Sequence, residues 1–361
     1  MKLGIIGSGQ LGLMMILEGK KLGIDFLVID KSKDGPASRI ADRAYQYDEF
    51  RNFVDSCDFI TYEFEHVDER VLNYAMEQGK LRPGILPVEL KRDRSKEKLF
   101  LRENGLPVGE FEVAEDATTA ARIGKEYGDA VIKLAHGGYD GKGQYLVKDG
   151  KLEEELPEGK YVVERFVEFD MEASVIAARD PNGKTAFFQP SLNVNYKGML
   201  YYNAAPIEDT GMKGIVKSLL DKLAYVGVIG VEFFLKDGVP FINEFAPRVH
   251  NSGHHTLMGS SISQFEQHVR AVCGIPLAEP VLYRPSGILN LVGISIDDEL
   301  EARILSVPET QVYWYGKNGI RKRRKVGHVN VSAQSYAELL ERIKQLSLLV
   351  YGSDLDEFFG Y

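Results

Sequence analysis

Residues 231–245 read VEFFLKDGVPFINEF, a pattern typical of a β-hairpin with one acid in each apolar arm. Asp, Gly and Pro at its centre are typical of a turn. With a three-residue loop, Lys236 pairs with Pro240, and Glu232 then lies directly opposite Glu244. Two like charges facing each other across a hairpin repel, so this stretch predicts a site that needs a compensating cation.

A hard divalent ion fits such a pair of carboxylates. Mg²⁺ takes oxygen ligands and is usually bound by carboxylates together with substrate phosphates. Two solvated acids on an exposed sheet face are the alternative, and for an arbitrary hairpin they are the better interpretation. The almost wholly apolar neighbours of Glu232 and Glu244, and a phosphate-type signal upstream, favour a magnesium site here.

Composition and charge narrow the class of protein. The 361 residues leave room for two or three domains and a large core. Hydrophobic content of 44% and charged content of 27% are ordinary for a soluble globular protein. A net charge of −9 argues against a nucleic-acid partner, although local basic groups can still hold anionic substrates.

The cysteines and the apolar runs bear on the compartment. Cys57 and Cys273 are far apart and have no metal-ligand spacing, so each is expected to be a buried small hydrophobe. No apolar run approaches the ~20 residues of a membrane span, and the N-terminus enters a strand pattern without a signal peptide. We therefore expect no membrane partner and a cytoplasmic location.

The first ninety residues alternate strand and helix signals. Strands are predicted at 2–7, 25–29 and 58–63, and a helix at 10–22 is closed by a glycine. This βαβ order predicts a parallel sheet. The segment 81–87 is predicted to be a linker.

Later elements are read from the same periodicities. A helix is predicted at 94–104, and further helices near 212–225 and 261–273. A hairpin is predicted near 312–331, followed by a helix at 335–349.

The motif Gly7-Ser8-Gly9-Gln10-Leu11-Gly12 lies between a strand and a helix, and Asp30 follows at the dinucleotide-fingerprint distance. Its physical content is narrower, because small residues and a helix N-terminus suit any phosphate-bearing ligand. A nicotinamide cofactor is therefore one open interpretation. Gln10 is placed to hydrogen-bond a ligand, or it is an ordinary surface residue.

A second glycine-rich loop, GGYDGKGQ at 137–144, follows a strand that carries Lys133 in an apolar run. Its N–H groups can wrap phosphate oxygens, but it lacks the ending of a P-loop. A plain glycine-rich hairpin is the alternative. The lysine on the preceding strand favours a nucleoside triphosphate.

Two further segments carry polar groups. The strand 162–167, followed by Glu172, can frame an adenine and offer a carboxylate to ribose, or it is an edge strand. The loop 245–255 gathers three histidines beside Arg248, which favours a ligand site without zinc-like spacing.

The basic run 321–325 can hold nucleic acid, face solvent, or bind a single phosphate, and the acidic chain favours the last. Strand alternation predicts Lys322 and Arg324 on one face, with Arg323 and Lys325 on the other.

Together these motifs resemble the N5-carboxyaminoimidazole ribonucleotide synthetase family of the ATP-grasp superfamily, which acts in de novo purine synthesis. The resemblance rests on five segments: GSGQLG (7–12), TYEFE (61–65), GYDGKGQ (138–144), NEFAPRVHNSGH (243–254) and SQFEQH (263–268). The fourth segment is highly specific, whereas the first is not. The resemblance implies ATP, Mg²⁺, bicarbonate and aminoimidazole ribonucleotide as ligands, and a homodimer.

The resemblance also implies an α/β and α+β chain with the ATP-grasp fold, a parallel α/β domain before it and a small β-rich domain after it. The implied domains are a Rossmann-like domain at 1–90, a small ATP-grasp subdomain with the flap at 91–170, a large subdomain with the metal site at 171–280, and a C-terminal domain at 281–361.

The implied chemistry has two steps. Bicarbonate attacks the γ-phosphate of ATP to give carboxyphosphate, and the acceptor's exocyclic amine then takes the carboxyl group and releases phosphate. Charge moves on phosphate oxygens in both steps, so positioning and cations matter more than a covalent nucleophile.

Site roles follow from the resemblance, motif by motif. ATP is assigned to Arg94, Lys133, Gly138, Tyr139, Asp140, Gly141, Lys142, Gly143, Gln144, Glu164, Val167, Glu172, Asn243 and Glu244. Bicarbonate and the amine are assigned to the catalytic residues Tyr139, Asp140, Arg248 and His250. The acceptor is assigned to Gln10, Leu11, Glu63, Arg248, Lys317 and Arg324, the last two at its 5′-phosphate. Mg²⁺ is assigned to Glu232 and Glu244.

Two positions depart from the superfamily pattern. Ala246 stands where many members have asparagine, which leaves the number of Mg²⁺ ions open, and Asn195 stands where the family often has histidine. The alternatives are a formate-using glycinamide ribonucleotide transformylase of the same superfamily, a dehydrogenase built on residues 7–12 and Asp30, and a non-catalytic nucleotide-sensing module.

Overall fold

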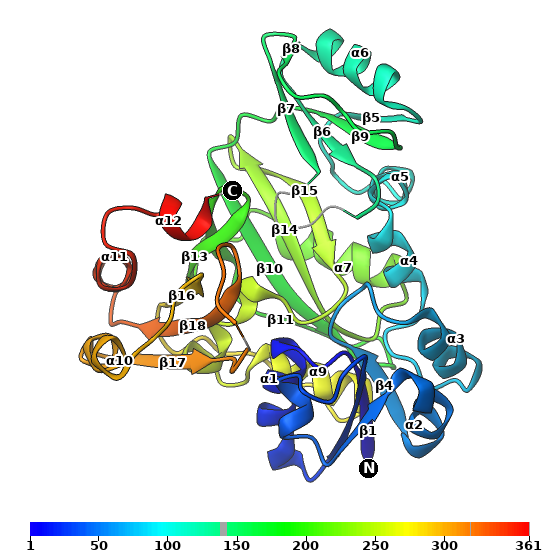
Figure 1. The fold of residues 1–361 in the computed structure, drawn as a ribbon, viewed down its shortest axis with the longest axis vertical. Coiled ribbons are helices and arrows are strands. Elements are labelled where there is room, and N and C mark those ends of the chain that lie inside the picture. Colours follow the sequence, from blue (N-terminus) through cyan, green and yellow to red (C-terminus); the bar gives the residue numbers. More distant parts are fainter. Residues whose placement is uncertain (138–142, 318, 361) are drawn as a thin grey trace.

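The computed structural model describes residues 1–137, 143–317 and 319–360, and in this part of the chain the strands form three sheets. The predicted residues Gly138, Tyr139, Asp140, Gly141 and Lys142 lie outside the described residues. Figure 1 shows the N-terminal sheet at the bottom, a small sheet at the top, and the C-terminal strands at the left of the largest sheet.

The N-terminal region forms a parallel sheet in the order β3-β2-β1-β4, as the alternating signals predict. Its strands are β1 (Lys2–Ile6), β2 (Asp25–Asp30), β3 (Arg43–Gln46) and β4 (Phe59–Tyr62). Its helices are α1 (Gln10–Gly19), α2 (Phe50–Ser56), α3 (Glu69–Glu77) and α4 (Leu86–Arg92), with short 3₁₀ turns η1 (Lys20–Leu22), η2 (Ala37–Arg39) and η3 (Tyr47–Glu49). Gly23 closes the first helical segment in the left-handed region, as expected.

Two features of this region differ from the prediction. Strand β3 is not predicted, because it is a short, mostly polar edge strand in which only Tyr45 is buried. Helix α4 begins inside the segment 81–87, which the sequence predicts to be a linker. Pro87 lies in its first turn, where a missing N–H costs nothing.

A small sheet in the order β5-β9-β6-β7-β8 carries the glycine-rich loop. Its strands are β5 (Phe111–Ala114), β6 (Ala130–Leu134), β7 (Gln144–Lys148), β8 (Lys151–Leu152) and β9 (Tyr161–Arg165), and α6 (Ala117–Tyr127) packs on it. The predicted helix at 94–104 is confirmed as α5 (Arg94–Glu103). The Asp93 carboxylate accepts the N–H groups of Ser95 and Lys96 and so caps its N-terminus.

The largest sheet runs in the order β15-β14-β10-β12-β13-β16-β18-β17, with β11 beside β10. Its strands are β10 (Met171–Arg179), β11 (Thr185–Phe187), β12 (Ser191–Tyr196), β13 (Met199–Ala205), β14 (Gly227–Lys236), β15 (Val239–Ala246), β16 (Ser286–Val292), β17 (Thr310–Trp314) and β18 (Lys325–Ser332). Because β13 pairs with β16, the sheet continues across residue 280.

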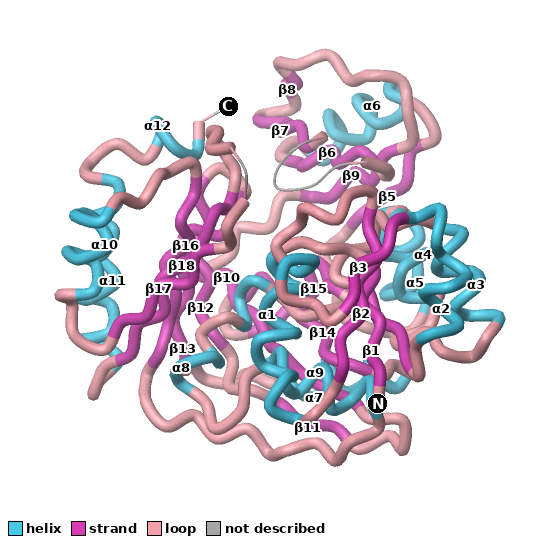
Figure 2. The backbone as a smooth tube through the Cα atoms, turned by 60° about the horizontal axis from the view of Figure 1, so that its bottom comes forward, coloured by secondary structure: helices cyan, strands magenta, loops and turns pink. Residues whose placement is uncertain are grey.

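The helices of this region are α7 (Met212–Lys222), α8 (Thr256–Gly259), α9 (Gln264–Cys273), α10 (Asp298–Leu305), α11 (Tyr336–Tyr351) and α12 (Asp356–Phe359), with the 3₁₀ turn η4 (Asn251–Gly253). Figure 2 shows α10 and α11 on one side of the C-terminal strands. The predicted helices near 212–225, 261–273 and 335–349 and the hairpin near 312–331 are confirmed. The predicted strand alternation in the basic run is wrong, because β18 begins at Lys325 and residues 321–324 lie in the preceding turn.

The glutamate hairpin forms with a different turn from the one predicted. Lys236 pairs with Val239 rather than with Pro240, so the turn holds two residues, both with positive φ. This turn alone would shift the register by one residue. A bulge between Glu232 and Phe233 restores it, and Glu232 faces Glu244 as predicted, for a reason that the sequence does not show.

A hydrophobic cluster fixes the N-terminal sheet against the large sheet. Leu3 and Met14 from the first sheet and helix α1 pack with Phe265 and Val269 of α9, all of them 0–1% exposed. Helix α9 in turn contacts β14. This packing brings the carboxyl ends of β1 and β4 close to the hairpin that carries the two glutamates.

Substituting Gly7 tests how tightly the first glycine loop is held. Gly7 has φ +104°, and a Cβ there would lie 2.6 Å from Glu63 Cγ. We expect Gly7→Ala to destabilise the protein by about 2 kcal/mol or more, measured by urea unfolding. Gly79→Ala is the control, because Gly79 has φ +68° but nothing within 4 Å of a new Cβ. Equal losses in the two variants would mean that the Glu63 contact contributes nothing.

Candidate active site

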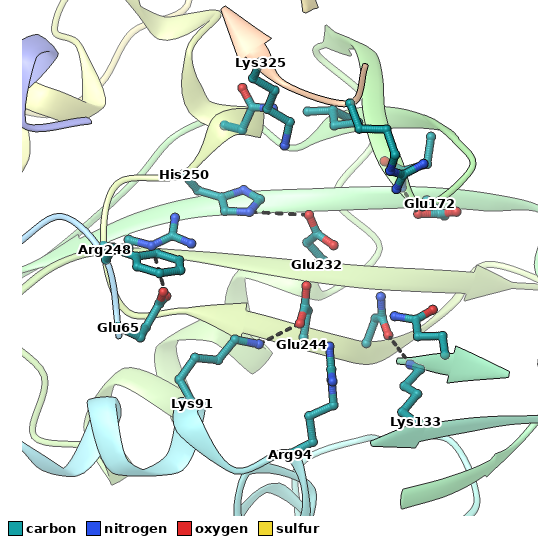
Figure 3. A pocket seen from close by; sticks show the side chains of 18 of the residues that line it. Glu65, Lys91, Arg94, Lys133, Glu172, Glu232, Glu244, Arg248, His250 and Lys325 are labelled. Atoms are coloured by element: carbon teal, nitrogen blue, oxygen red, sulfur yellow. Dashed lines mark hydrogen bonds and ion pairs between the residues drawn. The ribbon is translucent and has the colours of Figure 1, made fainter. Parts of the chain in front are cut away.

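A cleft of about 1120 Å³ opens between the sheets and collects residues from every region of the chain (Figure 3). Within the described residues, the sequence-predicted site residues that line it are Gln10, Leu11, Glu63, Arg94, Lys133, Gln144, Glu164, Val167, Glu172, Glu232, Asn243, Glu244, Arg248, His250, Lys317 and Arg324. Gly143 lies just before β7, where its carbonyl accepts the N–H of Leu134 at 2.8 Å.

The paired glutamates lie at the centre of the cleft. Figure 3 shows Glu232 and Glu244 on neighbouring strands with their carboxylates turned toward the same space. Burial, together with the facing Glu244 and Glu172, raises the pKa of Glu232 to about 8. Glu232 Oε1 lies 3.5 Å from His250 Nε2. The Glu232 carboxylate therefore stays protonated near neutral pH unless a cation joins it.

Glu244 has a counter-charge within the chain. Lys91 Nζ lies 2.6 Å from Glu244 Oε2 and 3.2 Å from Glu97 Oε2. Burial opposes the charged form of Glu244, but the pairing with Lys91 outweighs it and holds the Glu244 pKa well below its usual range. Glu97 is fixed in turn by the N–H of Phe245, at 3.0 Å. Lys91 is not predicted as a site residue from the sequence, because a lysine near a helix end carries no distinguishing pattern.

These groups fit a magnesium ion only in part. Over residues 1–137, 143–317 and 319–360, no set of three or more His, Cys, Asp or Glu side chains converges as a metal cluster. The two carboxylates would supply two ligands, and the remaining oxygens would come from phosphates and water, as is usual for Mg²⁺. The raised pKa of Glu232 indicates that, in the described part of the chain, cations do not compensate the ionised form of this carboxyl.

One end of the cleft is rich in cations. Glu164 is buried between Lys133 (2.8 Å) and Lys98 (2.9 Å), and these two ammonium groups outweigh burial and lower its pKa to about 2. Lys133 also lies 3.4 Å from Asn243 Oδ1. Glu164, expected to meet adenine, thus holds two lysines in place.

The wall beside this end is partly aromatic. Phe169 and Phe234 stack with ring centroids 4.6 Å apart. Asn195 donates a hydrogen bond to Glu172, whose pKa is raised by burial. Asn195 therefore holds Glu172, the residue predicted to bind the ribose of ATP, in place.

The loop after β15 brings an arginine and a histidine to the middle of the cleft. Arg248 Nε lies 3.0 Å from Glu65 Oε1, and its Nη1 donates to the Val249 carbonyl at 3.1 Å. Burial and the nearby Arg248 charge lower the pKa of His250 well below its usual value, so its imidazole is neutral. The Nδ1 of His250 lies 2.8 Å from Ser252 Oγ.

The first glycine loop is tied down from within the chain. Glu63 accepts the N–H groups of Gly9 and Gly12, the latter at 2.7 Å. Asp30 accepts both the N–H and the hydroxyl of Ser8, at 2.9 and 2.7 Å. In a nicotinamide-binding site Asp30 would bind a ribose hydroxyl, but here its carboxylate is engaged by Ser8 of the same chain. This contact argues against the dehydrogenase interpretation.

Basic groups cover the opposite end of the cleft. Lys317 Nζ donates to the Lys325 carbonyl and Arg324 Nη1 to the Gly319 carbonyl, each at 2.8 Å. Residues 321–325 all line the cleft, so the run bends around it as a turn rather than presenting two strand faces. Lining residues not singled out by the sequence include Lys91, Glu65, His66, His254 and Tyr315.

Comparisons with known proteins point to the same family over nearly the whole chain. Family models match at residues 1–89 (ribonucleotide synthetase preATP-grasp domain), 99–265 (ATP-grasp domain) and 286–342 (phosphoribosylaminoimidazole carboxylase C-terminal domain). The chain is 47% identical over 360 residues to an N5-carboxyaminoimidazole ribonucleotide synthase of Saccharolobus solfataricus, covering 98% of this chain and 97% of the relative.

Solved structures are similar over the same length. A phosphoribosylaminoimidazole carboxylase ATPase subunit from Aquifex aeolicus has a TM-score of 0.85 and 42% identity, covering 97% of this chain and 100% of that one. An Aspergillus clavatus N5-carboxyaminoimidazole synthase, solved with ADP and 5-aminoimidazole ribonucleotide, has a TM-score of 0.86 and 26% identity, with coverage of 97% and 98%. In the described part of this chain, no helix is long and apolar enough to cross a membrane.

The Glu232 pKa predicts how stability changes with pH. The folded protein keeps a proton on this carboxyl up to about pH 8, whereas the unfolded chain releases it near 4.5. Stability is therefore lost as the pH rises through this window. Glu232→Gln mimics the protonated side chain at every pH. Without nucleotide or metal, we expect this variant to melt roughly 5 °C above the wild type at pH 8 and together with it at pH 4.5.

The measurement is the melting temperature of both proteins between pH 4.5 and 8.5. Glu126→Gln is the control, since Glu126 is 58% exposed and pairs only with Arg122 on the surface of α6. Parallel curves for wild type and Glu232→Gln would contradict the raised pKa.

Proposed function

The chain belongs to the N5-carboxyaminoimidazole ribonucleotide synthase family and is an ATP-dependent ligase of the ATP-grasp type, and from this premise we propose how its residues divide the reaction. The substrates are ATP, bicarbonate and 5-aminoimidazole ribonucleotide. The products are N5-carboxyaminoimidazole ribonucleotide, ADP and phosphate. The observation that carries the proposal is a continuous cleft with one cationic end beside Lys133, a second beside Lys317, and Arg248 and His250 between them.

ATP is assigned to the end beside the small sheet. Lys133 and Arg94 carry fixed positive charge toward the triphosphate, and Glu164 keeps Lys133 in place through their 2.8 Å ion pair. The stacked Phe169 and Phe234 offer an apolar wall for a base. The binding of the ATP phosphates by the flap at residues 138–144 remains a prediction from the sequence.

Magnesium is assigned to Glu232 and Glu244. When bound, it would supply charge neutralisation for the triphosphate and for the phosphate released from it. The chain's own part is to present Glu244 in its ionised form, which Lys91 secures, and Glu232 directly opposite it across the hairpin.

Carboxyl transfer is assigned to the middle of the cleft. Bicarbonate oxygen attacks the γ-phosphorus of ATP, ADP leaves, and the resulting carboxyphosphate is then attacked at carbon by the acceptor amine, with phosphate leaving. Arg248 provides the charge for the carboxyl oxygens, and the neutral His250, whose Nδ1 accepts the Ser252 N–H, can donate a hydrogen bond from Nε2 to the same oxygens. The sequence predicts that Tyr139 and Asp140 also contact bicarbonate and the amine.

The acceptor is assigned to the end formed by the first sheet and the C-terminal strands. Gln10, Leu11 and Glu63 line its base-side wall, and Lys317 with Arg324 faces the 5′-phosphate. Homodimerisation and a cytoplasmic location remain part of the proposal from the sequence. The test of the whole assignment is ADP release with and without bicarbonate and the aminoimidazole nucleotide. Turnover with formate and glycinamide ribonucleotide instead would favour the transformylase.

Glu244→Gln tests the metal assignment. Replacing the ionised ligand removes half of the protein's contribution to the metal, so we expect kcat for ADP release to fall by about 100-fold or more. The variant should fold, because Gln keeps the shape of the side chain and 42% of the Glu244 side chain is exposed in the cleft. Glu126→Gln serves as the control. Near-normal turnover would remove Glu244 from the metal site.

Lys317→Ala tests the acceptor phosphate site. Losing one ammonium group from a phosphate site should raise the acceptor KM by about 10- to 100-fold and leave the ATP KM within about twofold. Lys344→Ala, at an exposed position on α11, is the matched control. Equal effects on the two KM values would place Lys317 outside the phosphate site.

A further inference from the structure

Glu65 is a buried carboxylate at the cleft that the proposed reaction does not use. Its side chain is 3% exposed, and its Oε1 lies 3.0 Å from Arg248 Nε. In Figure 3 the Arg248 guanidinium extends from this contact toward His250 and Glu232. Glu65 therefore lies beside Arg248 in the wall of the cleft, with little of its side chain exposed.

The backbone that carries Glu65 is itself clamped. Arg92 of α4 donates its Nε to the Glu65 carbonyl and its Nη2 to the Val67 carbonyl, both at 2.7 Å. Arg92 Nη1 pairs with Glu69 at 2.9 Å. The Glu65 carboxylate is thus presented from a fixed loop, so it can hold the guanidinium in one orientation.

An arginine needs such a partner at this position. Arg248 is 16% exposed, and Arg92 of the neighbouring helix α4 donates to the backbone carbonyl of the same Glu65. A single guanidinium on a loop has several rotamers, and a buried ion pair selects one of them at the cost of desolvating both groups. Removing the carboxylate would leave the hydrogen bond from Nη1 to the Val249 carbonyl but no carboxylate beside Nε, so the guanidinium would be held less firmly in its orientation.

The same loop also serves the acceptor end. Two residues before Glu65, Glu63 accepts the N–H groups of Gly9 and Gly12 and so fixes the first glycine loop. Residues 63–66 form bends rather than an extended strand, and the two acids leave the loop in different directions, one toward α1 and one toward Arg248. The segment 63–65 therefore contacts both the first glycine loop, at the proposed acceptor end, and Arg248, at the proposed site of carboxyl transfer.

We propose that Glu65 is a positioning residue that orients Arg248 toward the carboxyl group being transferred. This inference rests on the proposed role of Arg248 and assigns to Glu65 the orientation of that side chain. Losing the charge of Glu65 should weaken the use of bicarbonate while leaving ATP binding in place, since the Lys133 end is held by separate ion pairs.

The test is a double-mutant cycle with Glu65→Gln, Arg248→Ala and the combined variant. The measured quantities are kcat/KM for bicarbonate, the ATP KM, and the fraction of ATP hydrolysed without product. We expect Glu65→Gln to lower kcat/KM for bicarbonate by about 10- to 100-fold, with the ATP KM within about twofold. In the Arg248→Ala background the same substitution should change kcat/KM by less than about twofold, because its target is already gone.

Glu77→Gln is the matched control, since Glu77 is an exposed glutamate on α3 that takes no part in the Arg92 contacts. It should leave all three quantities unchanged. Glu65→Asp keeps the charge on a shorter side chain and should recover part of the loss. Melting temperatures of all variants, with and without a non-hydrolysable ATP analogue, separate misfolding from misplacement of Arg248.

The outcomes distinguish the two claims. Additive losses in the cycle, or a bicarbonate kcat/KM that Glu65→Gln leaves unchanged, would overturn the role of Glu65 alone. An Arg248→Ala enzyme with normal bicarbonate kinetics would instead overturn the proposed role of Arg248. A parallel fall in ATP-analogue binding and melting temperature for Glu65→Gln would assign Glu65 to the fold rather than to positioning.

Discussion

In the described part of the chain two carboxylates are held face to face and only one of them is paired with a lysine, and the candidate active site depends on this constraint. The hairpin register sets Glu232 opposite Glu244, and Lys91 neutralises Glu244 from the side. Glu232 is left with a pKa raised to about 8. The ionised form of Glu232 therefore needs a further cation, and the proposed function assigns that role to a metal bound to a triphosphate.

The rest of the cleft is organised around charges that are paired before any ligand binds. Glu164 secures two lysines, Glu65 pairs with Arg248, and Glu63 holds a pair of glycine N–H groups. These pairs join segments distant in sequence, and the Glu65–Arg248 pair also joins two regions of the fold, so long-range contacts orient the cleft's side chains. Preorganisation of this kind matters most for reactions that move charge between phosphate oxygens, because no covalent nucleophile is required.

Several sequence predictions succeed because they depend on local physics. The parallel N-terminal sheet and the helix that begins at Arg94 follow from periodicity and from short-range caps. The opposition of Glu232 and Glu244 is correct although the predicted turn is wrong, because a two-residue turn and a bulge compensate for each other. Bulges are set by cross-strand packing, which periodicity does not reveal. The basic run 321–325 likewise becomes a turn because it wraps the cleft rather than crossing a sheet.

The sequence by itself predicts the candidate reactive groups and determines the main elements that carry them, since motif chemistry and periodicity depend on neighbouring residues. The tertiary structure alone decides which of these groups are already engaged. It shows that Asp30 and Glu63 bind the first glycine loop from within, that Lys91 reaches Glu244, and that Glu65 lies beside Arg248. Such contacts join positions tens to hundreds of residues apart, and their energies depend on burial, which only the packed chain establishes.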